Sequence, residues 1–202
     1  MARILVLFAH PTLEKSRVHS QLIRQIPIQQ NITFHDLYET YPDFHIDIDR
    51  EQQLLLSHDI IIFQHPLYWY SAPPIIKQWL DLVLEHGWAY GANGTALTGK
   101  VMMQAVTSGG SFDSYNPGGK HKQKLPEYLA PFENTVKICN MDYWPPFVVH
   151  GTHRISDTDI QLHATQFKQM LLSLAADRIS AAERAGCFYM NDLFPIPSTI
   201  QS

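Results

Sequence analysis

Long apolar runs, an excess of basic residues and a secretion signal are all missing from this sequence of 202 residues. No apolar stretch approaches the roughly 20 residues that a membrane-spanning helix needs. The formal net charge is −4 and charged residues make up 17% of the chain, which leaves no basic surface for nucleic acid. The short apolar run near the N-terminus does not have the pattern of a signal peptide. We therefore expect a soluble, cytoplasmic protein without a nucleic-acid partner.

Ordered cysteine and histidine patterns are missing as well. The two cysteines, Cys139 and Cys187, do not have the spacing of a metal-ligand pair, so they are predicted to be free thiols in a reducing compartment. Eleven histidines are scattered along the chain and form no His-Glu-x-x-His motif. The sequence therefore predicts no metal site.

Two common phosphate-binding patterns are also missing, the Gly-x-x-x-x-Gly-Lys loop and the Gly-x-Gly-x-x-Gly turn. What is present is an apolar, strand-like run over residues 3–9, a loop over residues 10–20 with hydroxyl and basic side chains, and helical periodicity from Arg17. Backbone N–H groups at the start of a helix and the helix dipole favour an anion at such a place. Simple capping of the helix by Ser16 explains the same pattern.

The stretch of residues 59–87 is the feature around which the chain is organised. Ile60 to Phe63 form a short apolar run that predicts a strand buried on both faces, and helical periodicity starts at Pro74. The segment between them, residues 65–70, places three aromatic rings at the carboxyl end of the strand, where open α/β sheets bind ligands. The rings suit a flat, conjugated ligand. An aromatic plug over the end of the sheet explains them equally well.

Strand-like and helix-like segments alternate along the rest of the chain, with strands at residues 32–37, 100–106 and 147–150 and helices at 49–56, 125–137 and 157–178. Five strands that alternate with helices predict an α/β, flavodoxin-like three-layer sandwich with a five-stranded parallel sheet of order 2-1-3-4-5. Residues 38–48 read as irregular. We expect one domain over residues 1–179 and a tail over residues 180–202.

Three predicted strand ends carry loops that suit ligand binding: the loop of residues 10–20, the aromatic segment 65–70, and Thr107-Ser108-Gly109-Gly110-Ser111. Small and hydroxyl residues in the third loop allow the backbone to approach a ligand closely. In the predicted topology the three loops converge on one crevice. Such a crevice suits a ligand with an anionic group at one end and a flat ring at the other, and FMN has this form.

At these residues the sequence resembles the flavodoxin-like NAD(P)H:quinone oxidoreductases of the DT-diaphorase type, over residues 4–174. Within that family it is most similar to the bacterial ancillary flavoproteins of glutathione-gated potassium-efflux systems, at residues 41–48, 86–91 and 94–100. The family commonly has asparagine where this chain has His19, whose charge would titrate near neutral pH. The matching motifs are His10-Pro11 with Ser16-x-x-His19, the run from His65 to Asp81, and Thr107-Ser108-Gly109-Gly110.

The resemblance implies an enzyme that binds FMN, takes hydride from NADH or NADPH and reduces a quinone by two electrons, as a homodimer. It also implies roles: a phosphate site at the first loop, a flavin lining in the aromatic segment, and hydrogen bonds to the pyrimidine edge from the third loop. The implied catalytic residues are Tyr115 and His121. The implied cofactor-binding residues are His10, Ser16, Arg17, Val18, His19, Pro66, Leu67, Tyr68, Trp69, Tyr70, Thr107, Ser108, Gly109, Gly110 and Tyr115.

Two other functions fit the same residues. The first is a regulatory ancillary subunit of a glutathione-gated potassium-efflux antiporter, which would place the protein at the inner membrane through that partner. The second is an electron-transfer flavodoxin, which the modest net charge of −4 disfavours. For residues 112–124, which hold Tyr115 and His121, a solvated loop without a catalytic role is the alternative interpretation.

Overall fold

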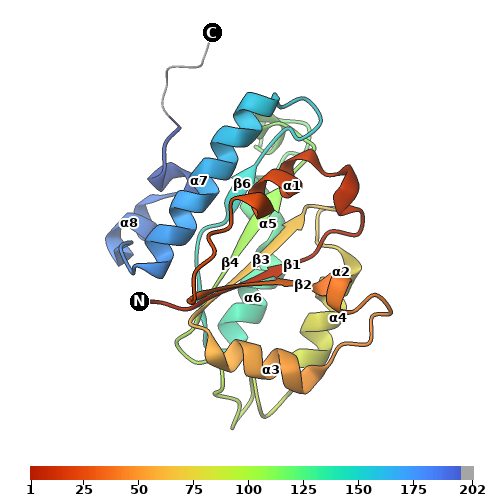
Figure 1. The fold of residues 1–202 in the computed structure, drawn as a ribbon, viewed down its shortest axis with the longest axis vertical. Helices are drawn as coiled ribbons and strands as arrows, with labels where there is room; N and C mark the ends of the chain where they lie inside the picture. Colours follow the sequence, from red (N-terminus) through yellow and green to blue (C-terminus); the bar gives the residue numbers. More distant parts are fainter. Residues whose placement is uncertain (197–202) are drawn as a thin grey trace.

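The computed structural model describes residues 1–196, so the last residues of the predicted tail, 197–202, lie outside the described residues. One parallel sheet runs through the molecule in the order β2-β1-β3-β4-β5, and β6 also pairs with β4 (Figure 1). This confirms the predicted fold and strand order. The strands are β1 (Ile4–Phe8), β2 (Ile32–Asp36), β3 (Ile60–Pro66), β4 (Val101–Thr107), β5 (Asp142–Tyr143) and β6 (Phe147–Val149).

The last strand predicted, residues 147–150, is found as β6, and β5 is a further short strand that was not predicted. β5 pairs with the beginning of β4 and β6 pairs with its end. Between them lie Pro145 and Pro146, which have no backbone N–H to donate to a ladder, so the pairing breaks there.

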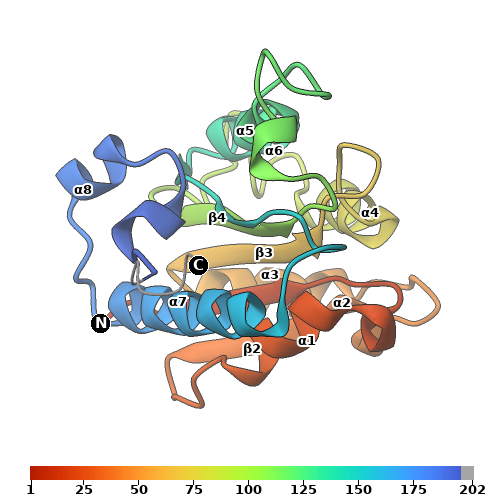
Figure 2. The same cartoon turned by 90° about the horizontal axis from the view of Figure 1, so that it is seen from above.

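Helices cover both faces of the sheet, because the central strands are apolar on both sides. In β1 the side chains of Ile4 and Val6 pack toward α1 (Arg17–Arg24) and α7 (Asp157–Ala175). Leu5 and Leu7 point to the opposite face. There they pack with α3 (Ile48–Ser57), α4 (Pro74–Val83) and α6 (Ala130–Ile138). In Figure 2, α7 lies in front of the strands.

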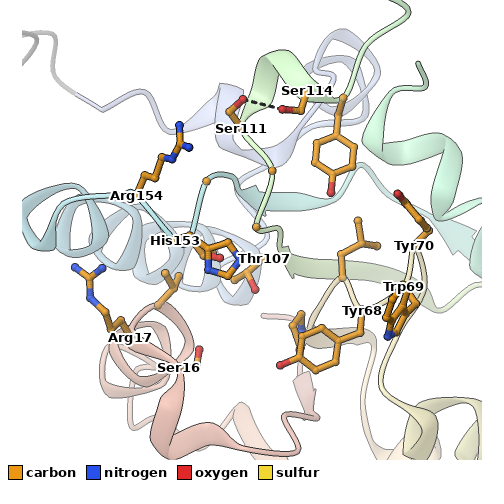
Figure 3. Close-up of a pocket in the computed structure, with 18 of the residues that line it drawn as sticks. Ser16, Arg17, Tyr68, Trp69, Tyr70, Thr107, Ser111, Ser114, His153 and Arg154 are labelled. Atoms are coloured by element: carbon orange, nitrogen blue, oxygen red, sulfur yellow. Dashed lines mark hydrogen bonds between the residues drawn. The ribbon is translucent and has the colours of Figure 1, made fainter. Parts of the chain in front are cut away.

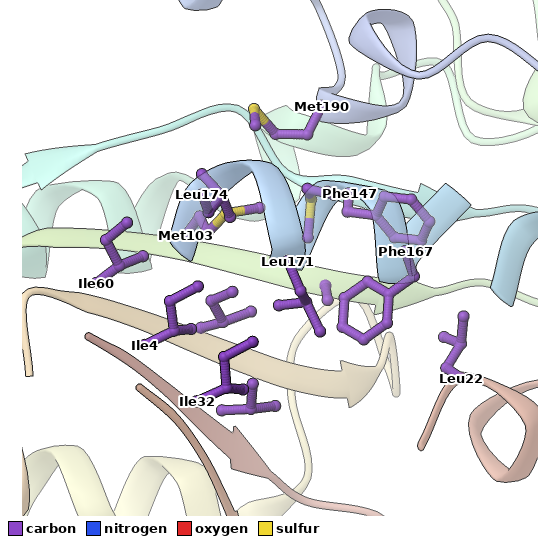
Figure 4. Packing of buried hydrophobic residues seen from close by; sticks show 14 of the residues in the cluster. Ile4, Leu22, Ile32, Ile60, Met103, Phe147, Phe167, Leu171, Leu174 and Met190 are labelled. Carbon is purple, nitrogen blue, oxygen red and sulfur yellow. The ribbon is translucent and has the colours of Figure 1, made fainter. Parts of the chain in front are cut away.

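The larger core lies under α7. Ile4, Ile32, Ile60 and Met103, one from each of four neighbouring strands, meet the apolar side of α7 (Figure 4). Phe167, Leu171 and Leu174 of that helix are almost completely buried, and burial of side chains of this size stabilises the fold by about 1.5–3 kcal/mol each. Among residues 1–196, no helix is both long and apolar enough to cross a membrane.

Several short elements differ from the predictions. The segment predicted as irregular contains α2 (Leu37–Thr40), which the Asp36 carboxylate caps by accepting the N–H groups of Tyr38 and Glu39. The predicted helix of residues 125–137 is divided into α5 (Leu125–Tyr128) and α6, because Pro131 has no N–H with which to continue the first helix. The other short helices are η1 (Leu13–Lys15), η2 (Phe112–Ser114), α8 (Ala181–Gly186) and η3 (Met190–Leu193).

Candidate functional site

One large cavity, of about 970 Å³, opens at the carboxyl ends of β1, β3 and β4 (Figure 3). β1 lies between β2 and β3, so the cavity occupies the point where the strand order reverses, which is the usual ligand site of such sheets. All the residues proposed from the sequence line it except His19 and Ser108. The other lining residues are Thr12, Lys15, Ser111, Ser114, Lys120, Gly151, Thr152, His153 and Arg154.

The start of α1 forms one end of the cavity. Ser16 caps the helix by accepting the backbone N–H of His19 at 3.2 Å, and the residues that follow it, Arg17 and Val18, line the cavity. Their N–H groups have no partner inside the helix. The Arg17 guanidinium is held by Asp157 at 2.6 Å, and no Asp or Glu side chain is among the lining residues. This end therefore suits a phosphate or another anion.

His19 lies behind the cavity wall. Its side chain is fully buried, with Nε2 at 3.0 Å from Thr107 Oγ1 and Nδ1 at 3.4 Å from Gln64 Nε2. Burial lowers the pKa of His19 well below its usual value, and the neighbouring His10 and His65 lower it further. The imidazole is therefore neutral and positions Thr107. The charge of His19 therefore does not change near neutral pH, which differs from our expectation.

The aromatic segment forms a tight turn at the cavity mouth. Trp69 and Tyr70 both have left-handed backbone conformations, with φ of 51° and 61°, and a bridge between Tyr68 and Ser71 closes the turn. Each such residue costs about 1–3 kcal/mol, and strain of this kind concentrates at ligand sites. The turn places Tyr68 and Tyr70 at the cavity and leaves Trp69 93% exposed.

Tyr115 and His121 form a stacked pair at the other end of the cavity. Their ring centroids are 4.4 Å apart, and His121 Nδ1 lies 3.3 Å from the Tyr70 hydroxyl. A Cβ atom at Gly110 would lie 2.9 Å from the Tyr115 ring and 3.2 Å from His121 Nε2, so a residue without a side chain is required. Burial raises the pKa of Tyr115, which keeps its hydroxyl protonated at neutral pH.

Ser108 is buried behind the loop that it belongs to. Its hydroxyl lies 3.0 Å from both the Gly110 carbonyl oxygen and His150 Nδ1, so it fixes the shape of the Gly109-Gly110 turn. Burial lowers the pKa of His150 to about 4, which leaves this imidazole neutral. The serine supports the cavity wall and does not line the cavity.

Residues 151–154, which were not predicted from the sequence, form a fourth wall of the cavity. His153 lies over Gly109, where an added Cβ atom would come within 2.6 Å of His153 Nε2. Arg154 lies at the same end of the cavity as Arg17 (Figure 3). This loop follows directly on β6, so the rule that located the other three loops, ligand contacts at strand ends, would also have found it.

Among residues 1–196, no cluster of three His, Cys, Asp or Glu side chains could hold a metal ion.

Comparison with known proteins places this architecture in a family. A family model described as flavodoxin-like fold matches residues 2–171. YrkL of Bacillus subtilis, named as an uncharacterized NAD(P)H oxidoreductase, is 41% identical over 84% of this chain and 97% of that protein. KefG of Yersinia enterocolitica, an ancillary protein of a glutathione-regulated potassium-efflux system, is 41% identical over 85% of this chain and 93% of that protein.

Solved structures of similar fold include the following two. General stress protein 14 of Treponema denticola, in complex with FMN, has a TM-score of 0.80 and 38% identity, over 85% of this chain and 99% of that chain. An NADPH-quinone reductase from P. pentosaceus has a TM-score of 0.75 and 32% identity, over 83% and 96% of the two chains. With the family match over most of its length, the chain belongs to the family with the flavodoxin-like fold.

Proposed function

We propose that this chain is an FMN-dependent NAD(P)H:quinone oxidoreductase. The observation that carries the proposal is a single cavity that joins an anion site at the start of α1 to aromatic side chains and the stacked pair of Tyr115 and His121. Its relatives support the proposal, because one structure is named as an FMN complex and others are named as NAD(P)H oxidoreductases or quinone reductases.

The cavity residues fit FMN. The N–H groups at the start of α1, with Lys15 and Arg17, match the charge of a phosphate, and the absence of lining carboxylates avoids repulsion. Tyr68 and Tyr70 provide flat surfaces for a conjugated ring. The cavity of about 970 Å³ lies at the upper end of the range for small-molecule sites, which leaves room for a substrate beside the flavin.

When bound, FMN would accept a hydride from NADH or NADPH and deliver it to a quinone. The protein's part in that chemistry is to orient the ring and to stabilise the charge that develops on it. The backbone of Gly109 and Gly110 can approach the ring edge closely, since neither residue has a side chain. Tyr115 holds a proton on its hydroxyl and His121 presents Nε2 toward Gly110, so both can donate to a developing anion at that edge.

The direct test is a titration of the purified, flavin-free chain with FMN, followed by assays of NADH and NADPH oxidation with and without a quinone. We expect one FMN per chain, and oxidation of the nicotinamide that depends on both FMN and quinone. A chain that binds no FMN, or that oxidises neither nicotinamide when FMN is bound, would refute the proposal.

The identity of 41% to KefG favours a second function, that of an ancillary subunit of a potassium-efflux system. In that case, co-expression with a glutathione-regulated potassium-efflux antiporter should raise potassium efflux from cells, and the two proteins should purify together from membranes. An efflux rate that the chain does not change would leave the enzyme as the only function of the two. Redox activity and partner binding are compatible with each other.

A further inference from the structure

The structure continues beyond the part of the chain that the family model matches. The match ends at residue 171, α7 ends at Ala175, and residues 176–196, here called the C-terminal extension, form α8 and η3. The extension is packed onto the domain. Met190 is fully buried in the core under α7, and its backbone N–H donates to the Pro146 carbonyl at 3.0 Å.

Asn191 attaches the extension to the edge of the sheet. Its side-chain oxygen accepts the Val148 N–H at 2.8 Å, and its amide group donates to the Val148 carbonyl at 3.1 Å. One side chain therefore satisfies both backbone groups of Val148 in β6, as a neighbouring strand would do. Gln166 of α7 fixes the other side of the extension by donating to the carbonyls of Asn191, at 3.1 Å, and Phe194, at 2.6 Å.

This attachment places Tyr189 behind the loop that holds Tyr115 and His121. Tyr189 is 6% exposed and belongs to a small buried cluster with Val106, Tyr115 and Val148. Its ring centroid is 5.7 Å from that of His150, which in turn is 5.7 Å from that of Tyr115. His121 stacks on Tyr115 at 4.4 Å. A continuous series of packed rings therefore leads from the extension to the cavity.

We propose that the C-terminal extension braces the loop of residues 107–121, and that Tyr189 is a positioning residue for Tyr115 and His121. The inference rests on the proposed function for its catalytic consequence. After Thr107, the last residue of β4, that loop has one short helix, η2, and no strand, so packing from behind has a large share in fixing where its rings lie. A displacement of about 1 Å at a reacting group is enough to slow a reaction by up to about a hundredfold.

The test uses the full chain with four substitutions. Tyr189→Leu removes the ring, Tyr189→Phe keeps it, and Asn191→Ala detaches the extension from Val148 without removing any apolar side chain. Glu183→Ala is the matched control, because it removes the carboxylate that accepts the Ser180 N–H and hydroxyl at the start of α8, within the same extension, and Glu183 is hydrogen-bonded to neither Tyr189 nor the loop. Asn191→Ala also serves if the leucine variant does not fold.

The first measurement is hydrogen–deuterium exchange of the backbone amides of residues 111–121 in the flavin-free protein. We expect faster exchange in Tyr189→Leu and Asn191→Ala, and wild-type exchange in Tyr189→Phe and Glu183→Ala. Unchanged exchange in both of the first two variants would overturn the inference. This readout does not depend on the proposed function, so it separates failure of the brace from failure of the enzyme assignment.

The second measurement is stopped-flow reduction of the bound flavin by NADPH, together with the dissociation constant of FMN. We expect the two disruptive variants to slow reduction at least threefold at saturating NADPH, with an unchanged FMN affinity, and Tyr189→Phe to restore the rate. Equal slowing by Glu183→Ala would show a general loss of stability and would overturn the positioning role.

Discussion

At the scale of single residues, Arg17 is the lining side chain best placed to select a phosphate. It is fixed by Asp157 at 2.6 Å and stands at the start of α1 beside the unpaired N–H groups. Charge-assisted hydrogen bonds of this kind contribute about 1.5–3 kcal/mol. We predict that Arg17→Ala weakens FMN binding about tenfold or more.

Two controls isolate the phosphate contact. Riboflavin has the same ring without the phosphate, so its dissociation constant, measured by fluorescence quenching, should not change in Arg17→Ala. Arg24→Ala removes an equal charge from the last turn of the same helix and should leave both ligands unaffected. An equal loss for FMN and riboflavin would mean that Arg17 acts on the ring or on the fold.

Tyr115 and His121 are predicted to act on the reaction and not on cofactor binding. Removal of one hydrogen-bond donor at a developing anion slows a reaction by about a hundred- to a thousandfold, and general acid–base catalysis contributes about a hundredfold or more. Because the two groups share the task here, we predict that Tyr115→Phe and His121→Gln each slow flavin reduction about tenfold or more. FMN affinity should stay within twofold of wild type.

Stopped-flow bleaching of the oxidised flavin at saturating NADPH measures this effect. Lys122→Asn is the control in the same loop, because Lys122 does not line the cavity and asparagine tolerates its left-handed backbone, with φ of 57°. Wild-type rates in both the Tyr115 and His121 variants, with the flavin fully bound, would show that neither residue takes part in the reaction.

His19 shows what residue patterns do not determine. Its place at the start of a helix after a strand follows from the sequence, but the direction of its side chain follows from the rotation of α1 against the sheet. That rotation buries the imidazole between Gln64 and Thr107, where it is neutral. The sequence is the same whether the His19 side chain points into the cavity or into the core, so only packing decides whether it contacts a ligand.

At the scale of secondary-structure elements, one buried carboxylate joins β2, α3 and α4. Glu51 is fully buried, and its two oxygens lie 2.7 Å from His35 Nε2, 2.6 Å from the Tyr41 hydroxyl and 2.7 Å from Trp79 Nε1. Burial opposes ionisation, but the hydrogen bonds from His35, Tyr41 and Trp79 outweigh it and hold the pKa of Glu51 below its usual range.

We predict that Glu51→Gln lowers the free energy of unfolding by about 1–3 kcal/mol at pH 7. The glutamine –NH2 group would replace one carboxylate oxygen, so a buried hydrogen-bond donor that this oxygen now accepts from would lose its acceptor. A carboxyl group with a lowered folded pKa stabilises the protein above its unfolded pKa, and this stabilisation is lost as the pH falls through the folded value. The difference between variant and wild type should therefore shrink in acid.

Urea unfolding curves from pH 7 down to the acid limit of folding measure both effects. Glu39→Gln makes the same chemical change at an exposed position of α2 and should alter neither the midpoint nor its pH dependence. A stability gap for Glu51→Gln that stays constant into acid would show that the charge of Glu51 does not contribute.

The long elements could be predicted from the sequence, and the short ones could not. β1, the first four residues of β3, and α7 have apolar patterns that match burial on both faces of a sheet or along one side of a helix. α2 and β5 have four and two residues, too few for a period to be recognised. α2 forms because the Asp36 side chain caps it, and β5 forms because it can pair with β4. Both interactions depend on the folded surroundings.

At the scale of the whole molecule, the parallel order of the sheet decides where the site lies. Because all strands run the same way, every loop at their carboxyl ends meets at one edge, and this alone collects the residues of the cavity from segments far apart in the sequence. The order followed from alternation of strands and helices. The fourth wall and the C-terminal extension depend on tertiary contacts that no local pattern contains.

The last prediction is that the chain forms a homodimer that covers Trp69. Its indole is 93% exposed and so buries little surface in its own chain, although the strained turn that holds it has a cost in free energy. Tyr70, the next residue in the same turn, is 49% exposed and adds to this surface. Apolar groups gathered at one site mark an interaction surface more often than scattered ones do.

Light scattering should give a mass about twice the 23.2 kDa of one chain at micromolar concentration. We expect Trp69→Ser to shift the equilibrium toward monomer on dilution, whereas Ile28→Ser, which removes a fully exposed apolar side chain from the loop after α1, should leave it unchanged. A monomeric wild-type chain would refute the prediction. A dimer that tolerates Trp69→Ser would place the interface on another face, and the exposed indole would then be available to a substrate or a different partner.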